Sequence, residues 1–379
     1  MADLFDIFDR YLVEVRGDGP SVNKLRKTFD RFATHEQERE PDIICDLTHI
    51  EPDPKEVFGA PDEYYGREGD RFIIKKPEGY GHLSINTSWD HVAMSPDVDH
   101  YLVAYIVEFE VRKRLAADGY ALIHASGVQF DETAVLFPAW RYTGKTNTMM
   151  TLLNSGADYL SDDRLWVGTD RSVLGYPVPI NMMVSNLETY PGLSDLSRIE
   201  QFRSYLVDLI NDRIDQDRSI FDKLAYFGTK FYLDPNLGRR LISVDQLIPT
   251  ADFVDKTTVS SVVSLRTRLD GSNVEVKKVP GKEALADISA ISLYEWNRDL
   301  EEYFATFDAL FSSSKTEELD KLIAKEEQNL NELFNHIETY RALIPREQDW
   351  KSTGIADEIQ QKLGNLDSST DVGHSATKK

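Results

Sequence analysis

The sequence has a single cysteine, Cys45, among 379 residues. It forms no intrachain disulfide and no cysteine-based metal cluster, which indicates a reducing compartment and makes the cytoplasm the expected location. Basic residues are also scarce, because 43 Lys and Arg stand against 65 Asp and Glu, for a net charge of −22. Binding to a nucleic-acid backbone depends on clustered positive charge, so this balance argues against a nucleic-acid partner.

Long hydrophobic runs are lacking as well. The longest, at residues 101–107 and 134–137, are far shorter than the roughly 20 residues that cross a bilayer. The acidic start MADLFDIFDRYLVEV lacks the pattern of a signal peptide, so we expect no membrane partner. Apolar residues still make up 41% of the chain, which is enough for a buried core in one large or two modest domains.

The first part of the chain is rich in β-like segments. Short runs of β-forming residues alternate with turn residues, and we predict a β-rich N-terminal region over residues 1–97. Between residues 36 and 70, twelve acidic residues stand against three basic ones. We interpret this acidic run as a solvated face.

The pattern then changes to helices and strands. Helices are expected at residues 98–118, 192–228 and 284–311, and strands at 240–248, 259–266 and 274–279. Gly119 would end the first helix. Asp270-Gly271 would join the last two strands in a hairpin.

A seven-residue repeat marks the stretch at residues 315–344, which we predict to be helical. The apolar residues that recur every seven positions are Ile323, Leu330, Ile337 and Ile344. Glu326 interrupts the companion positions. The stripe fits either a coiled coil, which would make a homo-oligomer through the C-terminal helix, or a helix that lies on its parent domain. We assign residues 312–345 to this helix and 346–379 to a mostly disordered tail.

A phosphate-loop pattern follows a short apolar strand predicted at residues 133–137, which we expect to be covered on both faces. The segment Ala139-Trp-Arg-Tyr-Thr-Gly144-Lys145-Thr146 has P-loop spacing, with alanine in place of the first glycine. The N–H groups of such a loop and of the helix after it surround a β-phosphate, Lys145 reaches the β- and γ-phosphates, and the Thr146 hydroxyl binds Mg²⁺. An ordinary strand-to-helix turn is the alternative.

Two adjacent aspartates, Asp162 and Asp163, follow the next predicted strand at residues 157–160. A compact strand–helix–strand crossover places this strand parallel to residues 133–137, and we expect the two to be neighbours. The aspartates then lie at the sheet edge that carries the phosphate loop. One carboxylate there can bind Mg²⁺ and the other can accept a proton from an attacking hydroxyl, whereas the structural alternative is a turn or a helix cap.

His124 is the third candidate. If Asp131-Glu132 forms a two-residue turn, hairpin partners have numbers that sum to 263, which places His124 opposite Ala139. A strand histidine is often only a core residue. Its expected position beside the loop and the aspartates keeps both a core role and a catalytic role open.

These segments resemble the catalytic core of HPr kinase/phosphorylase and its relatives, which is similar to the nucleotide site of phosphoenolpyruvate carboxykinase. The order is His-Ala-Ser-Gly-Val, a strand, the Gly-Lys-Thr loop, a helix, Gly-Ala-Asp and Ser-Asp-Asp-Arg. The resemblance covers residues 120–291 and is strongest over 120–168. It implies an α/β fold: a mixed sheet with a P-loop nucleotide-binding, kinase-like core at 98–311, beside the β-rich N-terminal region and the long C-terminal helix.

The resemblance also implies roles for single residues. Asp162 matches the base that accepts the proton of a serine hydroxyl, with Asp163, His124 and Lys145 as its catalytic partners. The implied cofactors are ATP and Mg²⁺. The residues expected to bind the nucleotide are Ala139, Arg141, Thr143, Gly144, Lys145, Thr146 and Asn147. The residues expected to bind the metal are Thr146 and Asp163.

The sequence leaves two functions open. The first is an ATP-dependent phosphotransferase acting on a hydroxyl of a protein, a peptide or a small molecule, with Arg141 and Arg164 adding charge near the γ-phosphate. The second is a non-catalytic ATP- or GTP-binding regulatory or scaffold protein, which the replaced glycine suggests. The family's Gly-rich C-terminal segment is not recognisable, so HPr is poorly supported as the acceptor. A decarboxylating carboxykinase ranks last, because its set of oxaloacetate-binding residues is not found.

Overall fold

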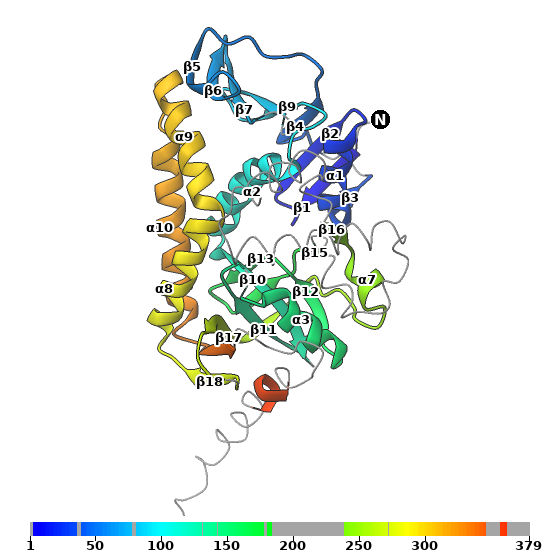
Figure 1. The fold of residues 1–379 in the computed structure, drawn as a ribbon, viewed down its shortest axis with the longest axis vertical. Helices are drawn as coiled ribbons and strands as arrows, with labels where there is room; N and C mark the ends of the chain where they lie inside the picture. The colour runs from blue at the N-terminus through cyan, green and yellow to red at the C-terminus, as the bar shows by residue number, and fades with distance from the viewer. Residues whose placement is uncertain are drawn as a thin grey trace, which may run out of the picture.

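The structure, a computed structural model, describes residues 3–35, 39–77, 81–130, 132–141, 143–177, 180–183, 239–271, 273–345 and 357–361. Within them the chain is an α/β protein with two large mixed sheets and helices between and beside them (Figure 1). The helix expected at 192–228 and most of the tail expected at 346–379 lie outside the described residues. None of the described helices combines the length and the apolar character that a bilayer span needs.

The N-terminal sheet has nine strands in the order β3-β1-β2-β4-β9-β8-β7-β6-β5. The strands are β1 Asp3–Ile7, β2 Tyr11–Arg16, β3 Ala33–Thr34, β4 Ile43–Leu47, β5 Glu56–Ala60, β6 Glu63–Glu68, β7 Arg71–Lys75, β8 His82–Asn86 and β9 His91–Met94. Helix α1 (Pro20–Phe29) follows β2. The strands β5 to β9 form an antiparallel meander, whereas β4 pairs in parallel with β2 and β9.

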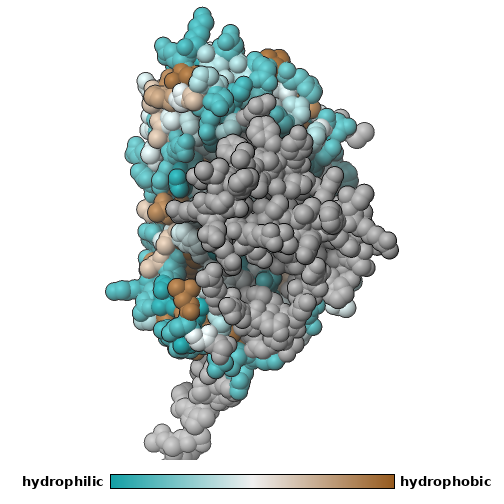
Figure 2. All heavy atoms as spheres, viewed as in Figure 1, coloured by the Kyte–Doolittle hydropathy of each residue, from teal (hydrophilic) through white to brown (hydrophobic). Residues whose placement is uncertain are grey.

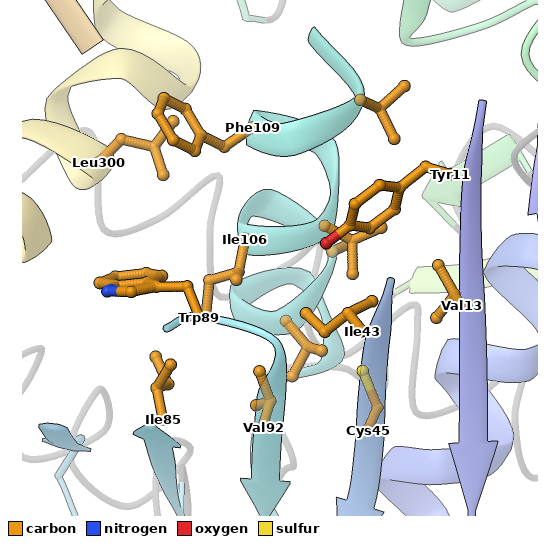
Figure 3. Close-up of a cluster of buried hydrophobic side chains, with 14 of the residues drawn as sticks. Tyr11, Val13, Ile43, Cys45, Ile85, Trp89, Val92, Ile106, Phe109 and Leu300 are labelled. Atoms are coloured by element: carbon orange, nitrogen blue, oxygen red, sulfur yellow. The ribbon is translucent and has the colours of Figure 1, made fainter. Parts of the chain in front are cut away.

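Helix α2 (His100–Ala117) packs on this sheet and builds one core with it. Figure 3 shows Tyr11, Ile43 and Val92 of the sheet beside Ile106 of the helix, with Leu300 of a later helix nearby. Asp99 caps α2 by accepting a hydrogen bond from the Tyr101 N–H. Gly119, at φ 92°, provides the left-handed residue that ends it. Cys45 is fully buried in this core, and burial raises the pKa of its thiol well above the usual range.

The second sheet has eight strands in the order β11-β10-β13-β14-β17-β19-β18, with β12 also paired to β10 and β11 also paired to β17. The strands are β10 Tyr120–Phe130, β11 Thr133–Pro138, β12 Asp158–Ser161, β13 Arg164–Gly168, β14 Ser172–Leu174, β17 Lys256–Arg268, β18 Glu275–Lys278 and β19 Glu338–Pro345. The pairings β11–β10–β13–β14–β17–β11 close a ring. A separate pair joins β15 (Ile180–Met183) to β16 (Arg239–Ile242).

The strand that leads to the phosphate loop is buried on both faces, as the sequence predicts. Val135 and Phe137 of β11 pack in a core with helix α3 (Lys145–Asn154). Ala134 and Leu136 pack in another core, with helix α8 (Gly281–Ser292). Packing against α3 on one face and α8 on the other therefore fixes the orientation of β11 and the position of the loop that follows it.

The single helix expected at residues 284–311 is three pieces. Helix α8 is followed by a π-helical turn, η3 (Leu293–Asn297), and then by α9 (Arg298–Phe311). The buried apolar side chains Ile291 and Trp296 are five residues apart, and the next one, Leu300, follows after four. The extra residue of the π turn changes which side chains face inward at this point.

The long C-terminal helix expected to reach residue 344 is shorter. Helix α10 (Lys315–Leu333) ends at Leu333, and residues 338–345 form β19. Tyr340, Ala342 and Ile344 are buried at every second position, which is the period of a strand. The seven-residue spacing of Ile337 and Ile344 suited either structure.

The apolar stripe of α10 is buried inside the chain, which is the second of the two alternatives. Leu319 and Leu322 belong to the core that contains α2, and Leu330 and Leu333 belong to the core that contains α8. Figure 1 shows α9 and α10 running side by side along one edge of the molecule. A homo-oligomer remains an untested prediction.

Three other strand expectations need correction. Strand β12 is not next to β11, because β10 pairs with both of them. The hairpin expected around Asp270-Gly271 is absent among the described strands, because β19 inserts between β17 and β18. The end of the strand expected at 240–248 is helix α7 (Val244–Leu247), in which the buried Val244, Leu247 and Ile248 have helical spacing.

Candidate functional site

The phosphate-loop segment connects β11 to α3. Gly144 adopts φ 95°, a left-handed conformation that favours glycine, and its carbonyl accepts the first helical hydrogen bond from the Thr148 N–H at 2.8 Å. Lys145 is therefore the first residue of α3, and its backbone lies at the positive end of the helix. Ala139, which replaces the first glycine of the pattern, is fully buried and bridges to Leu265 of β17. Its methyl group belongs to the core under α3.

The hairpin register agrees with the sequence prediction. Phe130 pairs with Thr133 and Ala125 pairs with Pro138, so the partners sum to 263. His124 is the next residue on β10 and lies at the beginning of the loop, opposite Arg164 of β13 on its other side. The two-residue turn thus brings a strand histidine to the phosphate loop.

Lys145, His124 and Asp163 form one cluster. Lys145 Nζ lies 3.0 Å from His124 Nε2 and 3.1 Å from Asp163 Oδ1. An ammonium donates to Nε2, which assigns the proton of a neutral imidazole to Nδ1. Nδ1 lies 3.3 Å from Asp163 Oδ1, a contact that lacks hydrogen-bond geometry.

The charges of this cluster fix its protonation. Burial and then the Lys145 ammonium lower the pKa of His124 to about 3, so the ring is neutral at pH 7. Burial alone would raise the pKa of Asp163, but the positive charges of Lys145 and Arg164 hold it well below the usual range. Asp163 is ionised, and its side chain keeps 37% of its surface exposed.

Asp162 has a different environment from its neighbour. Its Oδ2 accepts a hydrogen bond from the Thr146 hydroxyl at 3.0 Å. Its Oδ1 is buried and has no hydrogen-bond partner among the described residues. Burial raises the pKa of Asp162 to about 7, against the lowering effect of Lys145. One of the two adjacent carboxyls is thus ionised and the other is close to its titration midpoint at neutral pH.

Arg164 contacts the cluster from the buried interior of the protein. Its side chain is buried, pairs with the buried Glu108 of α2, and places Nε 3.0 Å from Asp163 Oδ2. Glu108 also accepts a hydrogen bond from the Tyr176 hydroxyl. Arg164 therefore forms buried ion pairs with Glu108 and Asp163, whereas the sequence analysis expected it to add charge near a γ-phosphate.

The sequence analysis missed the contribution of η3. Trp296 packs edge-on against the His124 ring, with centroids 5.3 Å apart. Glu295 accepts a hydrogen bond from Arg141 Nε at 2.8 Å, so the loop arginine is neutralised by an ion pair. The five-residue spacing of Ile291 and Trp296 is the sequence pattern that could have indicated the π turn. Leu293 and Tyr294 between them are also apolar, so the sequence does not show which of these residues are buried.

The remaining predicted loop residues lie along the same segment. Thr143 is buried, and its N–H donates to the Trp140 carbonyl at 3.2 Å. Asn147 lies in the first turn of α3, where its carbonyl accepts a hydrogen bond from the Thr151 hydroxyl. The structure therefore brings Lys145, Thr146, Asp162 and Asp163 together with His124. Ala139, Arg141, Thr143 and Asn147 lie along the loop and helix start that carry this group.

The donor set suits a hard cation. In the described parts of the chain no three His, Cys, Asp or Glu side chains form a metal-binding group. Mg²⁺, however, needs only one or two carboxylates when phosphates and water complete its shell. The Thr146 hydroxyl, the part-exposed Asp163 carboxylate and the unpartnered Asp162 Oδ1 are oxygen donors of this kind.

Comparisons with known proteins add little to this geometry. No protein-family model matches the chain, and no curated protein matches it. Among solved structures, the HPr(Ser) kinase/phosphatase from Coxiella burnetii matches with 10% identity and a TM-score of 0.26, over 67% of this chain and 99% of that one. A TM-score this low does not establish a shared fold, so the function has to be inferred from the site.

Proposed function

We propose that the protein is an ATP-dependent phosphotransferase that acts on a hydroxyl group. The observation that carries the proposal is the pair of unlike aspartates beside Lys145: Asp163 is ionised and bound by the lysine, while Asp162 has a raised pKa of about 7 and a buried free oxygen. Phosphoryl transfer needs positioning, charge neutralisation and a proton acceptor. This site has a candidate for each.

The loop and Lys145 would bind the phosphates of the nucleotide. The N–H groups at the start of α3, just after the left-handed Gly144, are the donors that would surround a phosphate. Without a nucleotide, Lys145 is held by Asp163 and His124. A phosphate would compete for the ammonium, and the two side chains would keep it directed at the loop.

Asp162 is the proposed general base. Its Oδ2 is fixed by Thr146, and its Oδ1, which has no hydrogen-bond partner among the described residues, would accept the proton of an incoming hydroxyl. As the acceptor oxygen bonds to the γ-phosphorus, the bond to ADP breaks and the hydroxyl proton passes to Oδ1. A base with a pKa near the working pH combines a large ionised fraction with useful basicity.

Thr146 and Asp163 are the residues proposed to hold Mg²⁺, with Asp162 beside them. When bound, the ion would neutralise phosphate charge. The hydrogen bond that joins Thr146 to Asp162 keeps the metal-binding hydroxyl and the base in contact.

The test combines binding with transfer. Titration calorimetry with Mg²⁺-ATP measures binding, and transfer of a labelled γ-phosphate to serine peptides and small alcohols measures chemistry. We expect Lys145→Ala to weaken binding roughly ten- to hundredfold, because a hydrogen bond to a charged group contributes about 1.5–3 kcal/mol. We expect Asp162→Asn to keep binding and to lose transfer by about 10²–10⁴-fold.

Lys321→Ala is the matched control, because this lysine lies exposed on α10 in a surface ion pair with Glu317. Full transfer activity in both site variants would refute the proposal. Tight nucleotide binding without transfer to any acceptor would instead favour a non-catalytic nucleotide-binding regulator.

A further inference from the structure

An exposed aromatic pair adjoins the phosphate loop. Trp140 of the loop and Tyr294 of η3 stack with ring centroids 4.3 Å apart and an interplanar angle of 30°. Each side chain keeps 42% of its surface exposed. The Arg141 guanidinium lies 5.2 Å from the Tyr294 centroid, so a third planar group continues the stack.

Such exposure is unusual for this molecule. Among the described residues, seven large hydrophobic side chains are exposed, and three of them, Trp140, Leu293 and Tyr294, are at this place. Among the coloured residues in the view of Figure 2, hydrophobic ones occur as small groups between mostly hydrophilic ones. Exposed apolar groups gathered at one place mark a binding surface more often than scattered ones do.

The π turn explains how this surface is held. Glu295 and Trp296 are buried and contact Arg141 and His124. Leu293 and Tyr294 are exposed, and Tyr294 stacks on Trp140. Without the extra residue of the π turn, the side chains after it would be rotated about the helix axis by one residue and would point in other directions. π turns are frequent at functional sites.

The charges select the kind of ligand. Because Glu295 neutralises Arg141, the stack offers π faces and no unpaired positive charge. Another phosphate would not favour this surface, but a flat uncharged ring would. Trp140 lies in the loop, where its carbonyl accepts a hydrogen bond from the Thr143 N–H just before Gly144. Trp296, two residues after Tyr294, packs on His124, whose Nε2 lies 3.0 Å from Lys145 Nζ, so the pair and the phosphate loop are neighbours.

We propose that Trp140 and Tyr294 form the subsite for the base of the nucleotide, which stacks on the open face of this pair. The inference rests on the proposed function, because the phosphates of the same nucleotide occupy the loop. Stacking on a π face does not depend on the identity of the base. The subsite therefore binds adenine and guanine nucleotides with similar affinity.

The test compares Mg²⁺-ATP with Mg²⁺-tripolyphosphate, which has the phosphates and no base, in titration calorimetry. We expect Trp140→Ala to weaken ATP binding about ten- to hundredfold, the contribution of one stacked base. Tyr294→Ala removes the ring that supports Trp140 and should weaken ATP binding less, and both variants should leave tripolyphosphate binding unchanged. Trp140→Phe, which keeps a ring, should retain most of the affinity. Phe58→Ala, an equally exposed aromatic on β5, should change neither ligand.

Two results would overturn the subsite while leaving the phosphate site intact. One is a wild-type protein that binds tripolyphosphate as tightly as ATP. The other is a Trp140→Ala variant that loses both ligands equally, which would make the pair a support for the loop. A wild-type protein that binds neither ligand would refute the proposed function itself, and the subsite with it.

Discussion

Glu326 of α10 and Arg112 of α2 form a buried, two-point ion pair. Arg112 Nε and Nη2 donate to the two carboxylate oxygens at 3.0 and 2.6 Å, and the side chains are only 2% and 8% exposed. Arg112 Nη1 also donates to Asn297 in η3, and the Leu122 N–H of β10 donates to Glu326. The charge that interrupts the apolar stripe thus ties α10 to the helix, the strand and the π turn that surround the site.

We expect Glu326→Ala to lower the free energy of unfolding by roughly 3–5 kcal/mol, since it leaves a buried arginine without its partner. Glu317→Ala on the same helix removes an exposed pair with Lys321 and should cost about 0–1 kcal/mol. Urea denaturation of both variants measures the difference. Equal effects in the two would show that the buried pair does not stabilise the packing of α10.

The raised pKa of Asp162 predicts the pH dependence of transfer. A base works only when ionised, so the rate should rise with pH, reach half of its maximum near pH 7 and then level off. A pH profile of kcat/KM for Mg²⁺-ATP, which reports the nucleotide-free enzyme to which this pKa belongs, measures this limb. A rate that is already maximal at pH 5 would contradict the assignment of Asp162 as the base.

His124 predicts a loss of stability in acid. Its pKa is about 3 in the folded protein and about 6.5 in the unfolded chain, so between these values the unfolded chain binds the extra proton. Stability therefore falls as the pH drops through this window, by up to about 1.4 kcal/mol per pH unit. His124→Asn, which cannot become charged, should lose less stability between pH 6.5 and 4. Parallel stability curves for the two proteins would refute a buried neutral histidine.

Gly144 and Gly156 allow strain to be separated from function. Both adopt a left-handed backbone, with φ 95° and 96°, but only Gly144 lies in the loop. Each change to alanine should cost roughly 1–2 kcal/mol of stability. Only Gly144→Ala should also weaken nucleotide binding, and calorimetry alongside denaturation measures both effects. Equal nucleotide affinity in the two variants would contradict the role of the loop.

Local patterns in the sequence were sufficient for the parts of the site that are close in the chain. The pairing of Phe130 with Thr133 sets the register that brings His124 to the loop, and the left-handed Gly144 comes just before Lys145, the first residue of α3. Asp162 and Asp163 reach the loop edge because they follow the strand after α3. The adjacency of β12 and β11 was wrong, because nothing local shows that β10 lies between them.

The other errors involve contacts between distant segments. Residues 338–345 have a spacing that suits a helix or a strand, and their pairing with β17 decides between the two. Glu326 looked like a polar interruption of a coiled coil because its partner is 214 residues away. The contact of Tyr294 with Trp140 depends on a π turn, and only the packing of the folded chain shows the extra residue of that turn.

The position of β19 has a consequence for synthesis of the chain. The last-made strand of this sheet lies between β17 and β18, and β18 pairs with β19 alone among the described strands. While the ribosome is still adding residues before 338, β17 has one open edge and β18 has no strand beside it. The sheet that carries the phosphate loop is therefore finished only when the chain has passed Pro345, and a polypeptide that ends earlier leaves an unpaired strand edge that can aggregate.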